Sequence, residues 1–109
     1  MVVFTPWHVP IMSPIWIVAG PMAGSLLQLR YPSTSFGRSP ANDYRFPDDS
    51  QMSRSQAVIE CEGSNFILRD LNSTNGTLVN GEPVTEIQLN PGDVIEMGEL
   101  QLEFLQGVK

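Results

Sequence analysis

The sequence is poor in the side chains that bind metals or carry redox and nucleophilic chemistry. Its 109 residues include one cysteine, Cys61, and one histidine, His8. A single cysteine cannot build a disulfide framework, and no cluster of cysteines and histidines is present to hold a structural zinc. Cys61 lies in an alternating apolar run, which is typical of a small buried side chain, and a reducing compartment fits this cysteine usage best. We therefore expect no metal site and a cytoplasmic location.

The sequence motifs of common nucleotide-binding and metal-dependent enzymes are also missing. The chain has no Walker loop, no dinucleotide fingerprint and no paired-histidine metal motif. The only histidine, His8, lies in a proline-broken segment, so a Ser-His or Cys-His pair would need that segment to fold back over a site. The sequence thus predicts a protein that is not an enzyme and uses no cofactor.

Positive charge is scarce and unevenly placed. Six Lys and Arg stand against twelve Asp and Glu, which gives a formal net charge of −6. This balance argues against general binding to nucleic acid or to an anionic membrane surface. Four arginines nevertheless lie in one short stretch: Arg30, Arg38, Arg45 and Arg54. Such a locally basic strip is compatible with a single anionic ligand and also with solvated surface arginines.

Long apolar runs without breaks are absent. The apolar segment from Met1 to Gly24 is interrupted by four prolines: Pro6, Pro10, Pro14 and Pro21. A membrane helix needs about twenty mostly apolar residues without such breaks, and no Lys or Arg precedes the segment as in a signal peptide. We expect no membrane span, and instead an irregular N-terminal arm over residues 1–13 that leads into a first strand near residues 15–18. A cut from a longer parent protein remains open.

The rest of the chain alternates short apolar runs with turn-forming clusters. No stretch of ten or more residues shows a helical period without a breaker, and groups of Gly, Pro, Asn, Asp and Ser separate the β-favouring runs. The expected strands cover residues 26–29, 56–62, 66–68, 77–79, 94–97 and 100–105. This pattern predicts an all-β domain of two sheets packed face to face, with function on the loops at its ends.

Three loops stand out by their content. The first contains Gly37-Arg38, the second contains Ser53-Arg54, and the third spans residues 72–76. Each is a weak signal by itself. Together they supply two guanidinium groups, a hydroxyl and an Asn on an Asn-Gly turn, which are the groups needed to hold a phosphate and an extended peptide backbone. Because no general base or metal cluster accompanies them, the pattern favours capture of a phosphorylated side chain over its turnover.

Four blocks of the chain resemble the forkhead-associated (FHA) domain. They are FGRS at 36–39, NDYRFPDDSQMSRSQAVI at 42–59, FILRDLNSTNGTLVNG at 66–81 and LNPGDVIEMGELQLEF at 89–104. The resemblance assigns residues 14–107 to an FHA domain and implies a β-sandwich of about eleven strands. It also implies that loops at one end bind a phosphothreonine-containing protein or peptide, with a Ser/Thr protein kinase acting upstream.

The resemblance also assigns roles to individual residues in the three loops. Arg38, Ser53 and Arg54 are expected to contact the phosphate. Thr74 is expected to add a hydrogen bond from the third loop. Asn75 is expected to hold the main chain of the ligand near the phosphothreonine.

A second group of residues is expected to shape the loops. Gly37 lets its loop turn tightly, Gly76 permits the conformation of the third loop, and Asn80 belongs to a hairpin turn and braces the neighbouring loop. Where the family usually has a histidine that braces the loops, two residues after Arg54, this chain has Gln56. Glutamine also donates and accepts hydrogen bonds, so we expect a modest change in loop rigidity rather than lost function.

Two other functions remain open at this point. The chain could keep the fold as an assembly domain that binds its partner without phosphate, a reading that Gln56 and the net acidity favour slightly and that Arg38, Ser53 and Asn75 oppose. It could also be an enzyme with Ser53 as nucleophile, although no base lies near it in the sequence. Dephosphorylation of the ligand separates the first two functions, and a turnover assay tests the third.

Overall fold

The computed structural model describes residues 14–19 and 24–105, and these form eleven strands and no helix. The strands are β1 Pro14–Ala19, β2 Leu26–Gln28, β3 Ser33–Gly37, β4 Tyr44–Arg45, β5 Ala57–Glu62, β6 Asn65–Asp70, β7 Thr77–Val79, β8 Glu82–Val84, β9 Glu86–Gln88, β10 Val94–Met97 and β11 Leu100–Phe104. The arm expected over residues 1–13 lies outside the described residues.

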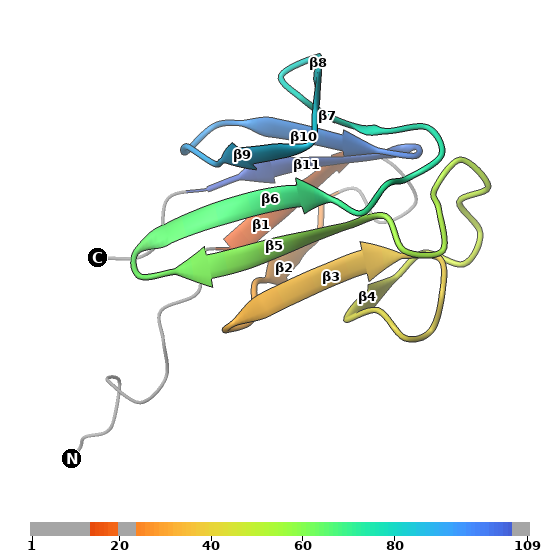
Figure 1. The fold of residues 1–109 in the computed structure, drawn as a ribbon, viewed down its shortest axis with the longest axis horizontal. Helices are drawn as coiled ribbons and strands as arrows, with labels where there is room; N and C mark the ends of the chain where they lie inside the picture. Colours follow the sequence, from red (N-terminus) through yellow and green to blue (C-terminus); the bar gives the residue numbers. More distant parts are fainter. Residues whose placement is uncertain (1–13, 20–23, 106–109) are drawn as a thin grey trace.

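The strands divide into two sheets that pack face to face (Figure 1). The first sheet has the order β2-β1-β11-β10-β7-β8, and the second has the order β4-β3-β5-β6-β9. The short β4 runs parallel to β3, whereas the other strand pairs of the described chain are antiparallel. The predicted all-β sandwich of about eleven strands is therefore confirmed.

Alternating burial along the strands builds one core between the sheets. In β11, Leu100, Leu102 and Phe104 are buried, whereas Gln101 and Glu103 between them are partly exposed. The same alternation places inward side chains of β3, β5, β6 and β10 in the same cluster. A slip of one residue would turn such a strand's apolar face to solvent, at a cost of about 1.5–3 kcal/mol for each large side chain exposed, so the core fixes the strand register.

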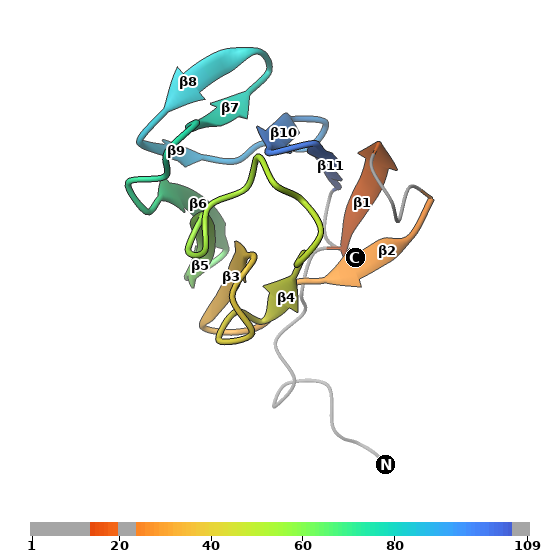
Figure 2. The ribbon, with the colours of Figure 1, turned by 90° about the vertical axis from the view of Figure 1, so that its right-hand side faces the viewer.

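The loops after β3, β4, β6 and β10 gather at one end of the sandwich, on the right in Figure 1. This follows from the pairing, because β3 and β6 both run antiparallel to β5, which lies between them. In Figure 2, which faces this end, the loop between β4 and β5 arches from the five-stranded sheet toward β10 of the other sheet. The backbone thus brings together loops that are far apart in sequence.

The second Asn-Gly pair forms the turn between β7 and β8. Val79 pairs with Glu82, which leaves Asn80 and Gly81 as a two-residue connection with φ values of 53° and 84°. Positive φ at both positions is the requirement of a type I′ hairpin turn. The Asn80 side chain bonds to the start of β10, where it donates to Asp93 (2.9 Å) and accepts from the backbone N–H of Val94 (2.9 Å). It therefore braces β10 and not the 72–76 loop.

Over the described residues, the structure offers no helical segment with the length and apolar character that a bilayer crossing requires.

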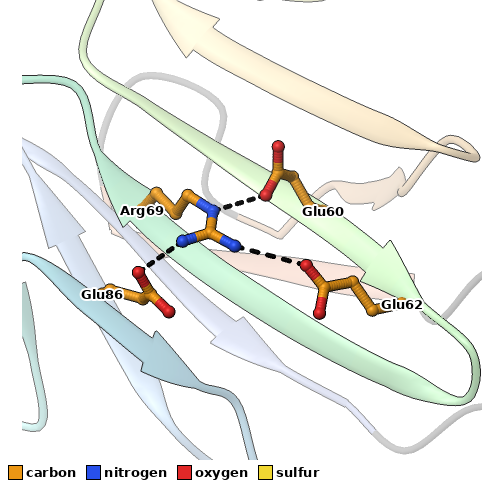
Figure 3. Close-up of polar contacts among 4 residues, drawn as sticks. All are labelled: Glu60, Glu62, Arg69 and Glu86. Atoms are coloured by element: carbon orange, nitrogen blue, oxygen red, sulfur yellow. Dashed lines mark hydrogen bonds and ion pairs between the residues drawn. The ribbon is translucent and has the colours of Figure 1, made fainter.

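A charged cluster covers the outer face of the five-stranded sheet (Figure 3). Arg69 of β6 forms ion pairs with Glu60 and Glu62 of β5 and with Glu86 of β9. The hydrogen bond with Glu60 is the largest cause of a raised Arg69 pKa, and the nearby carboxylate charges add to it against partial desolvation. The Arg69 guanidinium is therefore paired with carboxylates on the face of the sheet and does not belong to the group of arginines on the loops.

Replacement of Arg69 tests the balance of this cluster. Arg69→Gln leaves Glu60, Glu62 and Glu86 close together without their shared cation, so we expect a lower melting temperature whose deficit shrinks as salt screens the carboxylates. Calorimetric melting at low and high ionic strength measures this. Arg30→Gln makes the same charge change at an exposed arginine that precedes β3. An equal effect of salt on both variants would contradict the expectation.

Candidate functional site

The first two loops meet through their backbones at Gly37. The Arg38 N–H donates to the carbonyl of Ser53 at 3.0 Å. A Cβ placed on Gly37 would lie 2.2 Å from the carbonyl oxygen of Arg54 and 2.6 Å from Nδ2 of Asn42. Both distances are shorter than nonbonded atoms allow, so this approach of the loops requires glycine.

Arg38 is partly buried and held by a second contact to the same loop. Its Nε donates to the carbonyl oxygen of Met52 at 2.6 Å, and the Met52 side chain is anchored in the core with 1% exposure. Because Nε is used in this way, the contact leaves the two terminal NH2 groups of the guanidinium unused. The planar group is oriented before any ligand arrives.

Ser53 connects the second loop to the third. Its Oγ accepts the backbone N–H of Thr74 at 2.8 Å. A hydroxyl that accepts one hydrogen bond can still donate another, so the Ser53 O–H remains able to donate a hydrogen bond to a ligand oxygen. The side chains of Arg54 and Thr74 are exposed beside it.

Asn75 is exposed on the third loop and also contacts the second. Its Nδ2 donates to the carbonyl oxygen of Gln51 at 2.9 Å. Gly76, which follows it, has a φ of 83°, a conformation that glycine adopts without strain. Nδ2 also contacts Oε1 of Gln51 at 3.4 Å, so these bonds orient the carboxamide and leave its oxygen for an external main chain.

Gln56 is completely buried beneath these loops, with an exposure of 0%. Its Oε1 accepts the N–H of Ser53 at 2.8 Å, and its Nε2 donates to the carbonyl of Gly76 at 2.9 Å and to Oγ1 of Thr77 at 3.0 Å. One side chain thus joins the second loop to the end of the third loop and to the first residue of β7.

The polar network continues to Asp70 at the end of β6. Its Oδ1 accepts from the hydroxyls of Thr77 (2.7 Å) and Ser73 (2.5 Å), and its Oδ2 accepts from the backbone N–H of Ser73 (3.0 Å). Partial burial raises the pKa of Asp70, but these hydrogen bonds outweigh it, so the net pKa is lowered. The ionised carboxylate fixes the start of the third loop.

The structure brings most of the predicted site residues to one end of the sandwich (Figure 2). Those on the three loops are Arg38, Ser53, Arg54, Thr74 and Asn75, with Gly37, Gln56 and Gly76 among and beneath them. Asn80 lies apart from them, in the β7–β8 turn. Within the described part of the chain, no group of three or more His, Cys, Asp and Glu side chains could hold a metal ion.

Several groups that position the site were not predicted from the sequence. The carbonyls of Gln51 and Met52 carry no residue-type signal, because any residue supplies a backbone acceptor. Asn42 bonds through Nδ2 to the carbonyls of Ser39 (2.9 Å) and Arg54 (2.8 Å). Its place in a turn-forming Asn-Asp pair was the only signal that could have found it.

A sequence model of the FHA domain matches residues 34–98, more than half of the chain. The chain belongs to the FHA domain family. The glycogen accumulation regulator GarA of Mycolicibacterium smegmatis is 46% identical over 90 residues, which cover 83% of this chain and 56% of GarA. The chain thus spans little more than half the length of that relative.

Solved FHA domain structures have the same fold. One, from a structural and functional analysis of phosphothreonine-dependent FHA domain interactions, has a TM-score of 0.80 and 36% identity and covers 90% of this chain and 99% of its own. Another, Mycobacterium tuberculosis EmbR in complex with a low-affinity phosphopeptide, has a TM-score of 0.81 and 28% identity, with 90% of this chain and 25% of EmbR covered.

The buried carboxamide of Gln56 should be a major source of stability in this FHA domain. Gln56→Leu leaves the N–H of Ser53 and the carbonyl of Gly76 without their side-chain partner and removes one of the two hydrogen bonds of the Thr77 hydroxyl. We expect this to lower the free energy of unfolding by about 2–4 kcal/mol. Urea unfolding measures this change. Gln88→Leu, the same replacement at an exposed glutamine, should change stability by less than about 0.5 kcal/mol. Similar losses in both variants would contradict a special role for Gln56.

The lowered pKa of Asp70 predicts a pH-dependent contribution to stability. Its ionised form is favoured in the folded state, so the contribution is complete above the ordinary pKa of 3.8 and is lost as the pH falls below that value. We expect Asp70→Asn to cost about 1–2 kcal/mol near neutral pH, and the deficit to shrink toward about pH 2.5 because protonated Asp resembles Asn. Urea unfolding across this range tests it, with exposed Asp48→Asn as control. A deficit that is constant with pH would refute the assignment.

Proposed function

We propose that this FHA domain binds phosphothreonine-containing segments of partner proteins and so mediates phosphorylation-dependent interactions in Ser/Thr kinase signalling. The observation that carries the proposal is the contact of Arg38 Nε with the Met52 carbonyl. It fixes a guanidinium at the loop end with its forked terminal groups unused by that contact. Such a fork matches the oxygens of a phosphoryl group.

The three donors on the first two loops match the chemistry of a phosphate ester. Near neutral pH a phosphothreonine carries about −1.5 to −2 charges and three strong acceptor oxygens. Arg38 supplies the oriented fork, Ser53 supplies a hydroxyl whose oxygen already accepts from Thr74, and Arg54 supplies a second exposed guanidinium. We assign the phosphate to these three side chains.

The third loop completes the site by holding the peptide. Asn75 presents a carboxamide that is oriented by Gln51, and its oxygen can accept a backbone N–H of the peptide. Thr74 is exposed next to it and can add a hydroxyl contact. Because the contacting surface is small and exposed, we expect micromolar affinity.

The alternatives draw little support from the geometry. Gln56 in place of the family histidine, together with the net acidity, slightly favoured a phosphate-independent assembly domain. However, Gln56 pairs with groups on both the second and the third loop, so it can brace them as a histidine would. For a Ser53 nucleophile, the hydrogen bond to its Oγ comes from the backbone N–H of Thr74, which cannot act as a base.

Calorimetric titration with a degenerate phosphothreonine peptide pool tests the proposal. We expect binding of this pool, weaker binding of its phosphoserine twin and none of its unphosphorylated twin. One methyl group in an apolar environment is worth about 1–3 kcal/mol of discrimination, so we expect a preference of that size for phosphothreonine over phosphoserine. Arg38→Ala should weaken binding at least about 10-fold, because it removes charged hydrogen bonds of about 1.5–3 kcal/mol each.

Arg30→Ala is the matched control for this titration, because Arg30 is an exposed arginine that precedes β3 whereas Arg38 follows it. It should leave the affinity unchanged. Equal binding of phosphorylated and unphosphorylated pools would contradict the proposal and support the phosphate-independent assembly domain.

A further inference from the structure

Asp49 is a buried carboxylate in the loop between β4 and β5, with an exposure of 5%. Its Oδ2 accepts the backbone N–H of Glu99 at 2.8 Å, and its Oδ1 accepts the backbone N–H of Gln51 at 3.1 Å. Glu99 lies in the turn between β10 and β11, which belong to the other sheet. One side chain therefore ties the arching loop of Figure 2 to the six-stranded sheet.

The β10–β11 turn is shaped to receive this carboxylate. Met97 pairs with Leu100, so Gly98 and Glu99 form a two-residue turn, and Gly98 has the positive φ, 60°, of a type II′ turn. A Cβ on Gly98 would lie 2.5 Å and 2.7 Å from the two carboxylate oxygens of Asp49. Glycine is thus needed both for the turn and for the space that Asp49 occupies.

The segment that Asp49 holds supplies the acceptors that orient the site. The N–H of Met52 donates to the Asp49 carbonyl at 3.1 Å, which closes a tight turn over residues 49–52. Within this turn, the Gln51 carbonyl accepts from Asn75 and the Met52 carbonyl accepts from Arg38. Both acceptors therefore depend on the position of a turn whose first residue is anchored across the sandwich.

We propose that Asp49 is a positioning residue for Arg38 and Asn75. Its carboxylate fixes the 49–52 turn against the Gly98–Glu99 turn, and this contact aims the two ligand-facing side chains without touching the ligand. This inference rests on the proposed function, which identifies the ligand as a phosphothreonine-containing peptide. The orientation of the two side chains is measurable in the ligand-free protein.

Three variants isolate the contact. Asp49→Asn keeps the shape of the side chain but turns an NH2 group toward one of the two N–H donors. Gly98→Ala places a methyl group of the β10–β11 turn in the space that the Asp49 carboxylate occupies. If Asp49→Asn does not fold, Gly98→Ala still tests the contact. Asp48→Asn makes the same chemical change at the exposed neighbouring residue and serves as the control.

The first readout is nitrogen-proton NMR of the free protein. We expect the Arg38 Nε–H and Asn75 NH2 signals to shift and to exchange faster with water in Asp49→Asn and in Gly98→Ala, and to stay unchanged in Asp48→Asn. A carboxylate that only stabilises the fold would lower the melting temperature and leave these side-chain signals in place. That outcome would overturn the proposal.

The second readout is titration of the same variants with the degenerate phosphothreonine peptide pool. We expect each of the two variants to bind about 10-fold more weakly than the wild type, the size of effect expected for one hydrogen bond to a charged group. The double variant should bind no more weakly than the weaker single variant, because both changes break the same contact.

Unchanged affinity in both single variants, or fully additive losses, would refute the inference. If the wild type binds no peptide of the pool, the proposed function fails. The NMR signals of Arg38 and Asn75 then still decide whether Asp49 positions them.

Discussion

The carboxamide of Gln56 lies fully buried between two loops and the start of β7, and it pairs there with Ser53, Gly76 and Thr77. Buried N–H and C=O groups that lose their partners are costly, so these pairings set the spacing of the loops. Thr77 passes the network on to Asp70, which in turn holds Ser73. The loops of the candidate site therefore rest on a network of buried hydrogen bonds between the second and third loops and β7.

Much of the fold could be predicted because its long strands carry a clear pattern. The alternating apolar residues of β5 and β11 place these strands close to their observed bounds. Strands β3, β4, β8 and β9 were not predicted from the sequence. Strand β3 begins with Ser-Thr-Ser, β8 contains a proline, and β4 has only two residues, so hydrophobic alternation is weak or too short to detect. Tertiary pairing, not local preference, makes them strands.

The candidate site, like the fold, has parts that could be predicted from the sequence and parts that could not. Arg38, Ser53 and Asn75 could be proposed from the motif blocks, because side-chain chemistry marks them. The acceptor on Met52 could not, since every residue has a carbonyl, and the contact from Asp49 to Glu99 spans 50 residues and exists only once the two sheets pack. Local sequence therefore points to the side chains proposed to contact the ligand, whereas the hydrogen bonds that hold them exist only in the folded chain.

The reliance on backbone acceptors has an evolutionary consequence. Gln51, Met52 and Arg54 orient other groups through their carbonyl oxygens, which survive any substitution that preserves the turn. The Gln51 side chain adds a longer contact, in which its Oε1 accepts from Asn75 Nδ2 at 3.4 Å, but the carbonyl contact at 2.9 Å does not depend on it. The backbone contacts that hold the loops can therefore stay constant while the exposed side chains around them vary.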